Sequence, residues 1–281
     1  MMSKKNDPTF SAKDVNYVKH NRPYQNKKKF QTKNSFQIPK GKTHIKNTVF
    51  MYGLHTVSAA LNNPERKIIQ LSATQNAMLR LKWTPSDDNH FPVKIISSKA
   101  IDEQLGRDTT HQGVMLETHP LPSRDIDSIK NCKLLIVLDQ INDPHNVGAI
   151  LRSAVAFECG AVITTRRYSP SESGTLAKSA SGALELIPYI QVTNLSESLE
   201  ELHKLGFQTI GLDSESPQSI ESVFLGDKIA FVIGSEGKGL RQKIQKKVIA
   251  MARLNVPGAI KSLNVSNATA IALYTAHKFF N

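Results

Sequence analysis

The stretch "KLLIVLDQINDPHNVGAILRSAVAFECG", residues 133–160, decides the fold. Its first part is a continuous apolar run, which is typical of a strand in a parallel sheet covered on both faces. A polar loop follows from Asp139, and small apolar residues then recur at helical spacing up to Gly160, the expected end of the helix. Strand, polar loop and helix in this order indicate an α/β domain with a mostly parallel sheet.

The same alternation continues towards the C-terminus. Further strands are expected at 161–165, 187–192, 207–213, 228–234 and 248–256, and further helices at 174–182, at 194–206 and in the second half of 258–280. Pro188 places the strand at 187–192 at an edge of the sheet, because proline cannot donate a ladder hydrogen bond. Residues 131–281 are therefore predicted to form one domain with about six strands and five helices.

A smaller block precedes this domain, at residues 49–119. Its periodicity predicts helices at 52–63, 75–83 and 98–106, the last capped by Ser98, and strands at 67–73, 93–98 and 113–118. This pattern favours a small α/β layer structure. Residues 120–130 contain two prolines and are predicted to be a linker.

Positive charge is concentrated in the first 47 residues, which hold 10 of the chain's 12 net positive charges. The segment 1–48 has few apolar residues and is predicted to be a disordered basic arm. Such an arm favours a polyanion, and nucleic acid is preferred here over a tail that only improves solubility. The chain shows no apolar run of membrane-spanning length and no signal-peptide core, and its two cysteines have no metal-ligand spacing, so a cytoplasmic protein is expected.

Three polar, glycine-containing loops follow strands of the larger domain, at 139–152, 234–240 and 256–267. Because ligands bind at the carboxyl ends of the strands in open α/β sheets, the three loops are expected to form one composite site. The loop "GSEGKGL" lacks both the Walker A pattern and the dinucleotide-binding pattern of glycines. Asn146 is expected to cap the helix that carries Arg152, and an arginine on so apolar a helix suits either an ion pair or a bound phosphate.

These loops together resemble the motifs of the SpoU family of RNA 2′-O-ribose methyltransferases, within the knotted SPOUT superfamily. The matching segments are "NVGAILR" (146–152), "GSEGKGL" (234–240), "SLNVSNA" (262–268) and "KSASGALELIPY" (178–189). "YGLHTVSAALNNPERKI" and "HQGVMLE" are similar to the substrate-binding domain of the branch that methylates a guanosine in 23S rRNA, a domain with a ribosomal-protein-like fold. One departure is Gly258, which follows Pro257 where the family usually has methionine, with a shorter approach to the last motif.

The resemblance implies an α/β protein whose knotted SPOUT domain follows a small substrate-binding domain. It implies methyl transfer from S-adenosylmethionine to a ribose 2′-hydroxyl, in a homodimer that needs no metal. The catalytic residues implied are Arg152, Asn146, Glu236, Ser262 and Asn264. The residues implied to contact the cofactor are Gly234, Val256 and Leu263.

Among these residues, Arg152 is interpreted as the group that binds the phosphate of the target nucleotide and stabilises charge on the 2′-oxygen. A guanidinium is a poor base, so phosphate or water is expected to take the proton. His145 is a weaker candidate for that role, because the family motif does not require histidine there. Two other functions stay open at this point: the same chemistry on transfer RNA, and a non-catalytic RNA-binding or ribosome-assembly protein on the same scaffold.

Overall fold

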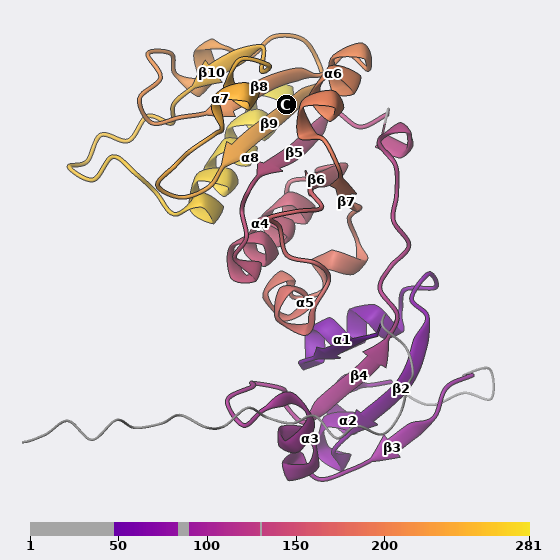
Figure 1. The fold of residues 1–281 in the computed structure, drawn as a ribbon. Coiled ribbons are helices and arrows are strands. Elements are labelled where there is room, and N and C mark those ends of the chain that lie inside the picture. The colour runs from indigo at the N-terminus through magenta and orange to yellow at the C-terminus, as the bar shows by residue number, and fades with distance from the viewer. Residues whose placement is uncertain (1–47, 84–89, 130) are drawn as a thin grey trace, which may run out of the picture. The chain divides into compact units, whose positions relative to one another are not determined.

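Figure 1 shows a computed structural model of the chain, which describes residues 48–83, 90–129 and 131–281. Apart from Thr48, the predicted basic arm lies outside the described residues. The described part contains two sheets, one of four strands and one of six. Within it, no helix has both the length and the apolar character that a membrane span requires. The α/β class predicted from the sequence is confirmed.

The first sheet belongs to the N-terminal block, a name used below for residues 49–118, and its strand order is β1-β4-β2-β3. The elements of the block are β1 (Val49–Tyr52), α1 (Leu54–Leu61), β2 (Ile68–Ala73), α2 (Gln75–Leu81), β3 (Val93–Ile95), α3 (Ser98–Leu105) and β4 (Val114–Thr118). β4 pairs antiparallel with both β1 and β2, whereas β2 and β3 run parallel.

Two local predictions in this block are wrong. Tyr52 ends strand β1 instead of starting a helix, because Gly53, with a φ of 90°, separates the strand from α1. At α3 the cap is Ser97 and not Ser98, since the Ser97 side chain accepts a hydrogen bond from the N–H of Ala100 at 3.2 Å. The strand expected at 93–98 is correspondingly short and ends at Ile95.

The second sheet holds six parallel strands in the order β10-β8-β9-β5-β6-β7. Its strands are β5 (Leu134–Asp139), β6 (Ala161–Thr165), β7 (Tyr189–Val192), β8 (Gln208–Leu212), β9 (Ile229–Gly234) and β10 (Ala250–Ala252). Its helices are α4 (Pro144–Ala156), α5 (Gly174–Ala180), α6 (Leu195–Lys204), α7 (Gln242–Gln245) and α8 (Val265–Phe280). The edge position predicted for β7 is confirmed, and β10 is shorter than the strand expected at 248–256.

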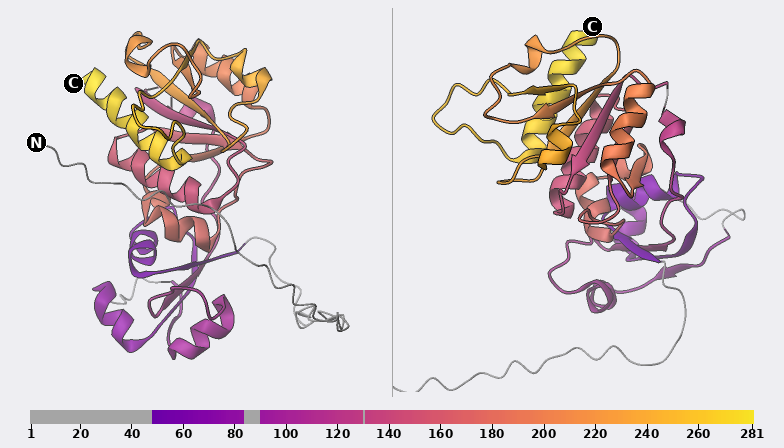
Figure 2. Two further views of the ribbon diagram at one scale, coloured as in Figure 1. Left: turned by 90° about the vertical axis from the view of Figure 1, so that its left-hand side faces the viewer. Right: turned by 45° about the horizontal axis from the view of Figure 1, so that its top comes forward.

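Helices cover both faces of the second sheet. α4, α5 and α8 contribute to one apolar cluster, and α6 and α7 contribute to the other, together with a 3-10 turn at Ile126–Ile129 in the predicted linker. Figure 2 shows α8, in yellow, and α6, in orange, on opposite sides of the strands. With both faces covered, the edge at which the strands end is where this sheet can present polar residues to a ligand.

Helix α4 begins and ends differently from its prediction. It starts two residues before Asn146, and its cap is Asp143, whose carboxylate accepts a hydrogen bond from the N–H of His145 at 3.0 Å. The helix ends at Ala156, before Gly160 is reached. Gly160 has a packing role instead, because a Cβ there would lie 2.1 Å from the Cys132 sulfur. The prediction that Asn146 caps the helix is therefore wrong, and Asn146 lies in the first turn of the helix.

Candidate active site at the carboxyl edge of the parallel sheet

The three polar loops meet at one end of the second sheet. Strands β5 and β9 are neighbours, and their last residues, Asp139 and Gly234, are paired in register. The loop after β5 leads into α4, the loop after β9 leads to α7, and the segment after β10 leads into α8. The composite site expected from the sequence is therefore assembled from loops that lie far apart along the chain.

Three of the expected residues form one hydrogen-bonded network. The side-chain amide of Asn264 donates to the Glu236 carboxylate at 2.8 Å and to the side-chain oxygen Oδ1 of Asn146 at 3.0 Å. The Asn146 amide donates to the same Glu236 oxygen at 3.4 Å, and the backbone N–H of Val265 also donates to it, at 3.2 Å. Each loop supplies one member, so the network ties all three loops together.

Asn264 has a second task at the start of α8. Its side-chain oxygen Oδ1 accepts a hydrogen bond from the N–H of Ser266 at 2.9 Å and thereby caps the helix. The Glu236 carboxylate lies at the same helix end, where the helix dipole favours negative charge. The polar residues of "SLNVSN" thus combine a helix cap with a contact to two distant loops.

An ion pair between Arg241 and Asp139, which was not predicted from the sequence, holds the loop after β9 in place. The Asp139 side chain is fully buried and receives hydrogen bonds from Arg241, from Nε at 2.8 Å and from the backbone N–H at 3.1 Å. A buried carboxylate needs such partners. The available signal was an aspartate that ends an otherwise apolar strand, a position that demands a compensating cation.

Gly148 in the first motif serves helix packing. A Cβ at this position would lie 2.4 Å from the Ser179 Cβ and 2.8 Å from the backbone nitrogen of Ala180, so only glycine lets α4 and α5 approach this closely. His145 accompanies this contact, with its Nδ1 3.0 Å from the Ser179 hydroxyl. Helix α5 therefore supports the first turn of α4, which carries Asn146.

Arg152 and Ser262 stand apart from the network. Arg152 is exposed on α4, and among the described residues no hydrogen bond or ion pair joins its guanidinium to another side chain. Ser262 is also exposed and lies two residues before Asn264. The geometry thus connects Asn146, Glu236 and Asn264 directly, and among the described residues it does not connect Arg152 to them.

A cavity of about 430 Å³ opens beside the network, and Glu236 lies in its wall. Gly234, Val256 and Leu263, the three residues expected to contact a cofactor, all line it. The wall also includes residues that were not predicted, at and beyond the end of β8: Leu212, Asp213, Ser214 and Glu215. These residues could have been predicted from the sequence, because they form a polar run directly after a strand, the same pattern that identified the other loops.

The shape of this cavity depends on Gly234. A Cβ there would lie 2.1 Å from the carbonyl carbon of Gly239, because the loop folds back over the end of its own strand. Ser235 and Gly239 form an isolated β-bridge in this turn, and the N–H of Gly239 donates to the Ser235 carbonyl at 2.9 Å. Only glycine at position 234 therefore lets the loop fold back this closely over the strand.

Comparison with protein families gives two matches that account for most of the chain. Residues 133–274 match the family described as SpoU rRNA Methylase. Residues 50–124 match the family described as RNA 2′-O ribose methyltransferase substrate binding. The first match contains all three loops of the site, and the second contains nearly the whole N-terminal block.

Curated relatives match over almost their full length. The 23S rRNA (guanosine-2′-O-)-methyltransferase RlmB of Coxiella burnetii is 33% identical over 236 residues, covering 81% of this chain and 94% of the relative. The protein of the same name from Xylella fastidiosa strain 9a5c is 32% identical over 242 residues, covering 82% and 96%.

Solved structures share the fold. The SpoU methyltransferase AviRb from Streptomyces viridochromogenes, in complex with the cofactor AdoMet, superposes with a TM-score of 0.70 at 18% identity, covering 83% of this chain and 90% of that chain. The AdoMet-bound rRNA methyltransferase from Sinorhizobium meliloti gives 0.71 at 21% identity, covering 84% and 88%.

Proposed function

The chain belongs to the SpoU rRNA methylase family, and on this premise we propose that it transfers the methyl group of S-adenosylmethionine to the 2′-hydroxyl of a guanosine ribose in 23S rRNA. The observation that carries the proposal is the Asn146–Glu236–Asn264 network beside the cavity at the carboxyl edge. The match of residues 50–124 to a substrate-binding family supports an RNA substrate.

The cavity suits this cofactor in size and chemistry. Its volume of about 430 Å³ lies within the range of ~300–1,000 Å³ usual for small-ligand sites. Leu212, Val256 and Leu263 supply apolar wall, while Asp213 and Glu215 supply carboxylates for a ligand that carries positive charge and ribose hydroxyls. Gly234 also lines it. When bound, S-adenosylmethionine supplies a reactive methyl group.

Arg152 acts on the RNA in this proposal. Its exposed guanidinium keeps its donors available, and such a fork binds a phosphate in bidentate fashion. Bound there, it also stabilises negative charge that develops on the ribose 2′-oxygen. Because a guanidinium does not give up its proton near neutral pH, the phosphate or a water molecule takes the hydroxyl proton.

The hydrogen-bonded network fixes the position of the ribose. Asn146, Glu236 and Asn264 restrain one another, so their remaining donors and acceptors face the substrate in a preset arrangement. Ser262, exposed at the cavity wall, adds a hydroxyl to the polar surface. Orientation of this kind supplies much of the rate enhancement in a displacement that needs three atoms in line.

The proposal includes a homodimer, a knot and a cytoplasmic location. Ile271, Tyr274 and Phe279 on α8 are 44%, 54% and 46% exposed, which is apolar surface suited to a second copy of the chain. The knot is proposed because the chain belongs to the SpoU rRNA methylase family. The basic segment 1–47 favours contact with RNA by its charge.

The test uses purified protein, S-adenosylmethionine with a labelled methyl group, and unmodified 23S rRNA and transfer RNA as separate substrates. The proposal predicts that nuclease digestion of the 23S rRNA yields labelled 2′-O-methylguanosine. Label found only in transfer RNA would show that transfer RNA is the substrate and would leave the proposed methyl-transfer chemistry unchanged. RNA binding without any transfer would favour a non-catalytic assembly protein.

A further inference from the structure

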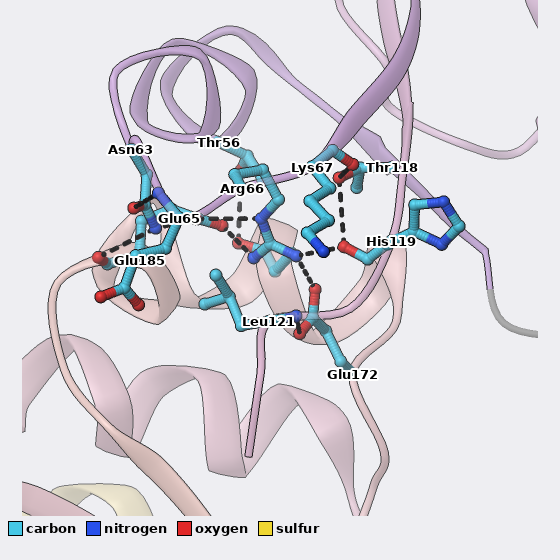
Figure 3. Close-up of polar contacts among 11 residues, drawn as sticks. Thr56, Asn63, Glu65, Arg66, Lys67, Thr118, His119, Leu121, Glu172 and Glu185 are labelled. Carbon is cyan, nitrogen blue, oxygen red and sulfur yellow. Dashed lines mark hydrogen bonds and ion pairs between the residues drawn. The ribbon is translucent and has the colours of Figure 1, made fainter. Parts of the chain in front are cut away.

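Several motifs of the N-terminal block have no part in the chemistry above, yet they converge on one element. They are "YG" at 52–53, "NNPER" at 62–66 and "HQG" at 111–113, and each contacts the segment from Glu172 to Glu185. This segment contains α5 and a 3-10 turn at Ala183–Glu185, and we refer to it as the docking segment. Figure 3 shows the largest group of these contacts, gathered around Arg66.

Arg66 forms the centre of a buried ion-pair cluster. Its side chain is fully buried, and its guanidinium pairs with Glu172 through Nη1 and with Glu185 through Nη2. Its Nε also donates to Glu185 at 3.1 Å, and its Nη1 donates to the backbone carbonyl of His119 at 3.0 Å. A single arginine thus joins the N-terminal block, the segment that leaves it and both ends of the docking segment.

The two carboxylates outnumber the guanidinium, and neighbouring N–H groups satisfy the excess. The Asn63 amide donates to Glu185 at 2.8 Å, and the Leu121 N–H donates to Glu172 at 3.0 Å (Figure 3). Burial alone would lower the pKa of Arg66, but hydrogen bonding and charge from Glu185 and Glu172 outweigh it and raise the pKa. Removing Arg66 would leave two carboxylates without a cation, whereas removing one glutamate would leave a single ion pair.

A second group of contacts lies along α5. The Gln112 side-chain carbonyl accepts hydrogen bonds from the Lys178 ammonium at 2.9 Å and from the Leu54 N–H at 3.0 Å. Gly53 makes room for this lysine, because a Cβ there would lie 2.4 Å from its nitrogen. The Thr56 hydroxyl donates to the carbonyl of Ala177 at 3.2 Å within the buried interface. These contacts restrain α5 along its length as well as at the ends of the docking segment.

The docking segment also touches the catalytic helix. On its other side α5 packs against α4 at Gly148, and Ser179 lies 3.0 Å from His145, the residue before Asn146. The N-terminal block and the first turn of α4 are therefore in contact with the same short helix. A change in how the block packs against α5 would therefore shift the block relative to the helix that carries Asn146 and Arg152.

We propose that Arg66, with Glu172 and Glu185, positions the N-terminal block on the docking segment and so determines which ribose of the bound RNA reaches the catalytic loops. This inference rests on the proposed function, because it assumes that the N-terminal block binds the RNA. Arg66 and the two glutamates are positioning residues that act through the block and have no contact with the reacting atoms.

The test compares three variants of the full-length protein. Glu185→Gln removes one charge and keeps the shape, which leaves Arg66 paired with Glu172 alone. Arg66→Gln breaks the whole cluster. Glu65→Gln is the matched control, because it removes an ion pair with Arg124 at 2.7 Å in which both side chains are about half exposed, one residue from Arg66.

Three readouts separate positioning from stability. The first is kcat and KM for 23S rRNA, measured separately, together with a map of the methylated nucleotides. The second is the affinity for S-adenosylmethionine, measured by calorimetry. The third is the rate of amide hydrogen exchange in residues 172–186. Both cluster variants are expected to lower kcat/KM for 23S rRNA by about tenfold or more and to spread methylation to neighbouring nucleotides, since a misplacement of ~1 Å costs ~100-fold in rate. Cofactor affinity is expected to change by less than about twofold, and Glu65→Gln to match the wild type, because a half-exposed ion pair contributes little.

The inference is overturned if Glu185→Gln keeps the wild-type kcat/KM and methylation site, whether or not hydrogen exchange of the docking segment rises. If Arg66→Gln fails to fold, Glu185→Gln decides alone, because it leaves one positive and one negative charge in the cluster. If the wild-type protein methylates no RNA, the proposed function fails. Hydrogen exchange of residues 172–186 then tests the role of the cluster independently of activity. Faster exchange in Glu185→Gln than in Glu65→Gln supports the docking role, and equal exchange refutes it.

Discussion

Gly148→Ala tests the contact between α4 and α5 most sharply. The new methyl group would lie 2.4 Å from the Ser179 Cβ and 2.8 and 2.9 Å from backbone atoms of Ala180 and Ser179. No rotation of a flexible side chain relieves contacts with backbone, so one helix has to move by about 1 Å to restore ordinary van der Waals spacing.

The size of the effect follows from two opposing contributions. Alanine in place of glycine inside a helix favours folding by about 1 kcal/mol. Overpacking a close contact costs roughly 1–3 kcal/mol and occasionally more, and a clash with backbone belongs at the upper end. We therefore expect a net loss of about 2 kcal/mol, which corresponds to a fall in Tm of roughly 4–8 °C for a domain of this size.

Urea unfolding and calorimetry measure this loss, and Gly258→Ala is the control. A Cβ at Gly258 would meet nothing within 4 Å, so its substitution should leave stability unchanged or slightly higher. Because α4 carries Asn146 and Arg152, methyl transfer by Gly148→Ala should fall even where the protein is fully folded. A Gly148→Ala variant as stable and as active as the wild type would refute the packing role assigned to this glycine.

Three further predictions follow from the described contacts and from the charge of the arm. Asn264→Ser should keep the cap of α8 while losing methyl transfer, whereas Asn264→Ala should also lose about 1 kcal/mol of stability; equal activity of Asn264→Ser and wild type would contradict the network. Burial raises the pKa of Cys159, so its thiol should resist iodoacetamide in the native state. Because the unfolded chain ionises this thiol more readily, the free energy of unfolding should be unaffected by it below about pH 8.5 and should fall above that pH. Rapid alkylation of the folded protein would contradict this prediction. Deleting residues 1–47 should flatten the salt dependence of RNA affinity, and an unchanged slope would show that the arm does not contact RNA.

Local patterns in the sequence were sufficient for most elements of the larger domain. The apolar run of β5 and the leucine spacing of α6 predict buried elements because burial acts on every residue of a strand or on one face of a helix. Element ends were less predictable. Asp143 and Asn146 are both good helix caps, and the sequence does not show which one adopts the extended backbone that a cap requires.

Contacts between distant segments could not be predicted from local patterns. The pairing of Arg66 with Glu185 joins residues 119 positions apart, and Arg241 and Asp139 are 102 positions apart. Nothing in a window of neighbouring residues connects them, and only the register of the folded sheet and the docking of the N-terminal block bring them together. The three loops could be proposed as one site because ligands gather at strand ends, a rule that extends beyond local sequence. The residues at 146, 236 and 264 within those loops were proposed from the resemblance to the SpoU family.

The most direct test of the central claim is a nucleotide-resolution map of ribose methylation in 23S rRNA after treatment with wild-type protein and with Arg152→Ala. We expect the wild type to methylate the 2′-hydroxyl of one guanosine. We expect Arg152→Ala to leave that guanosine unmodified, because the exposed guanidinium that binds phosphate and stabilises the 2′-oxygen is gone. Methylation of the same nucleotide at the wild-type level by Arg152→Ala, or no methylated ribose with either protein, would contradict the account.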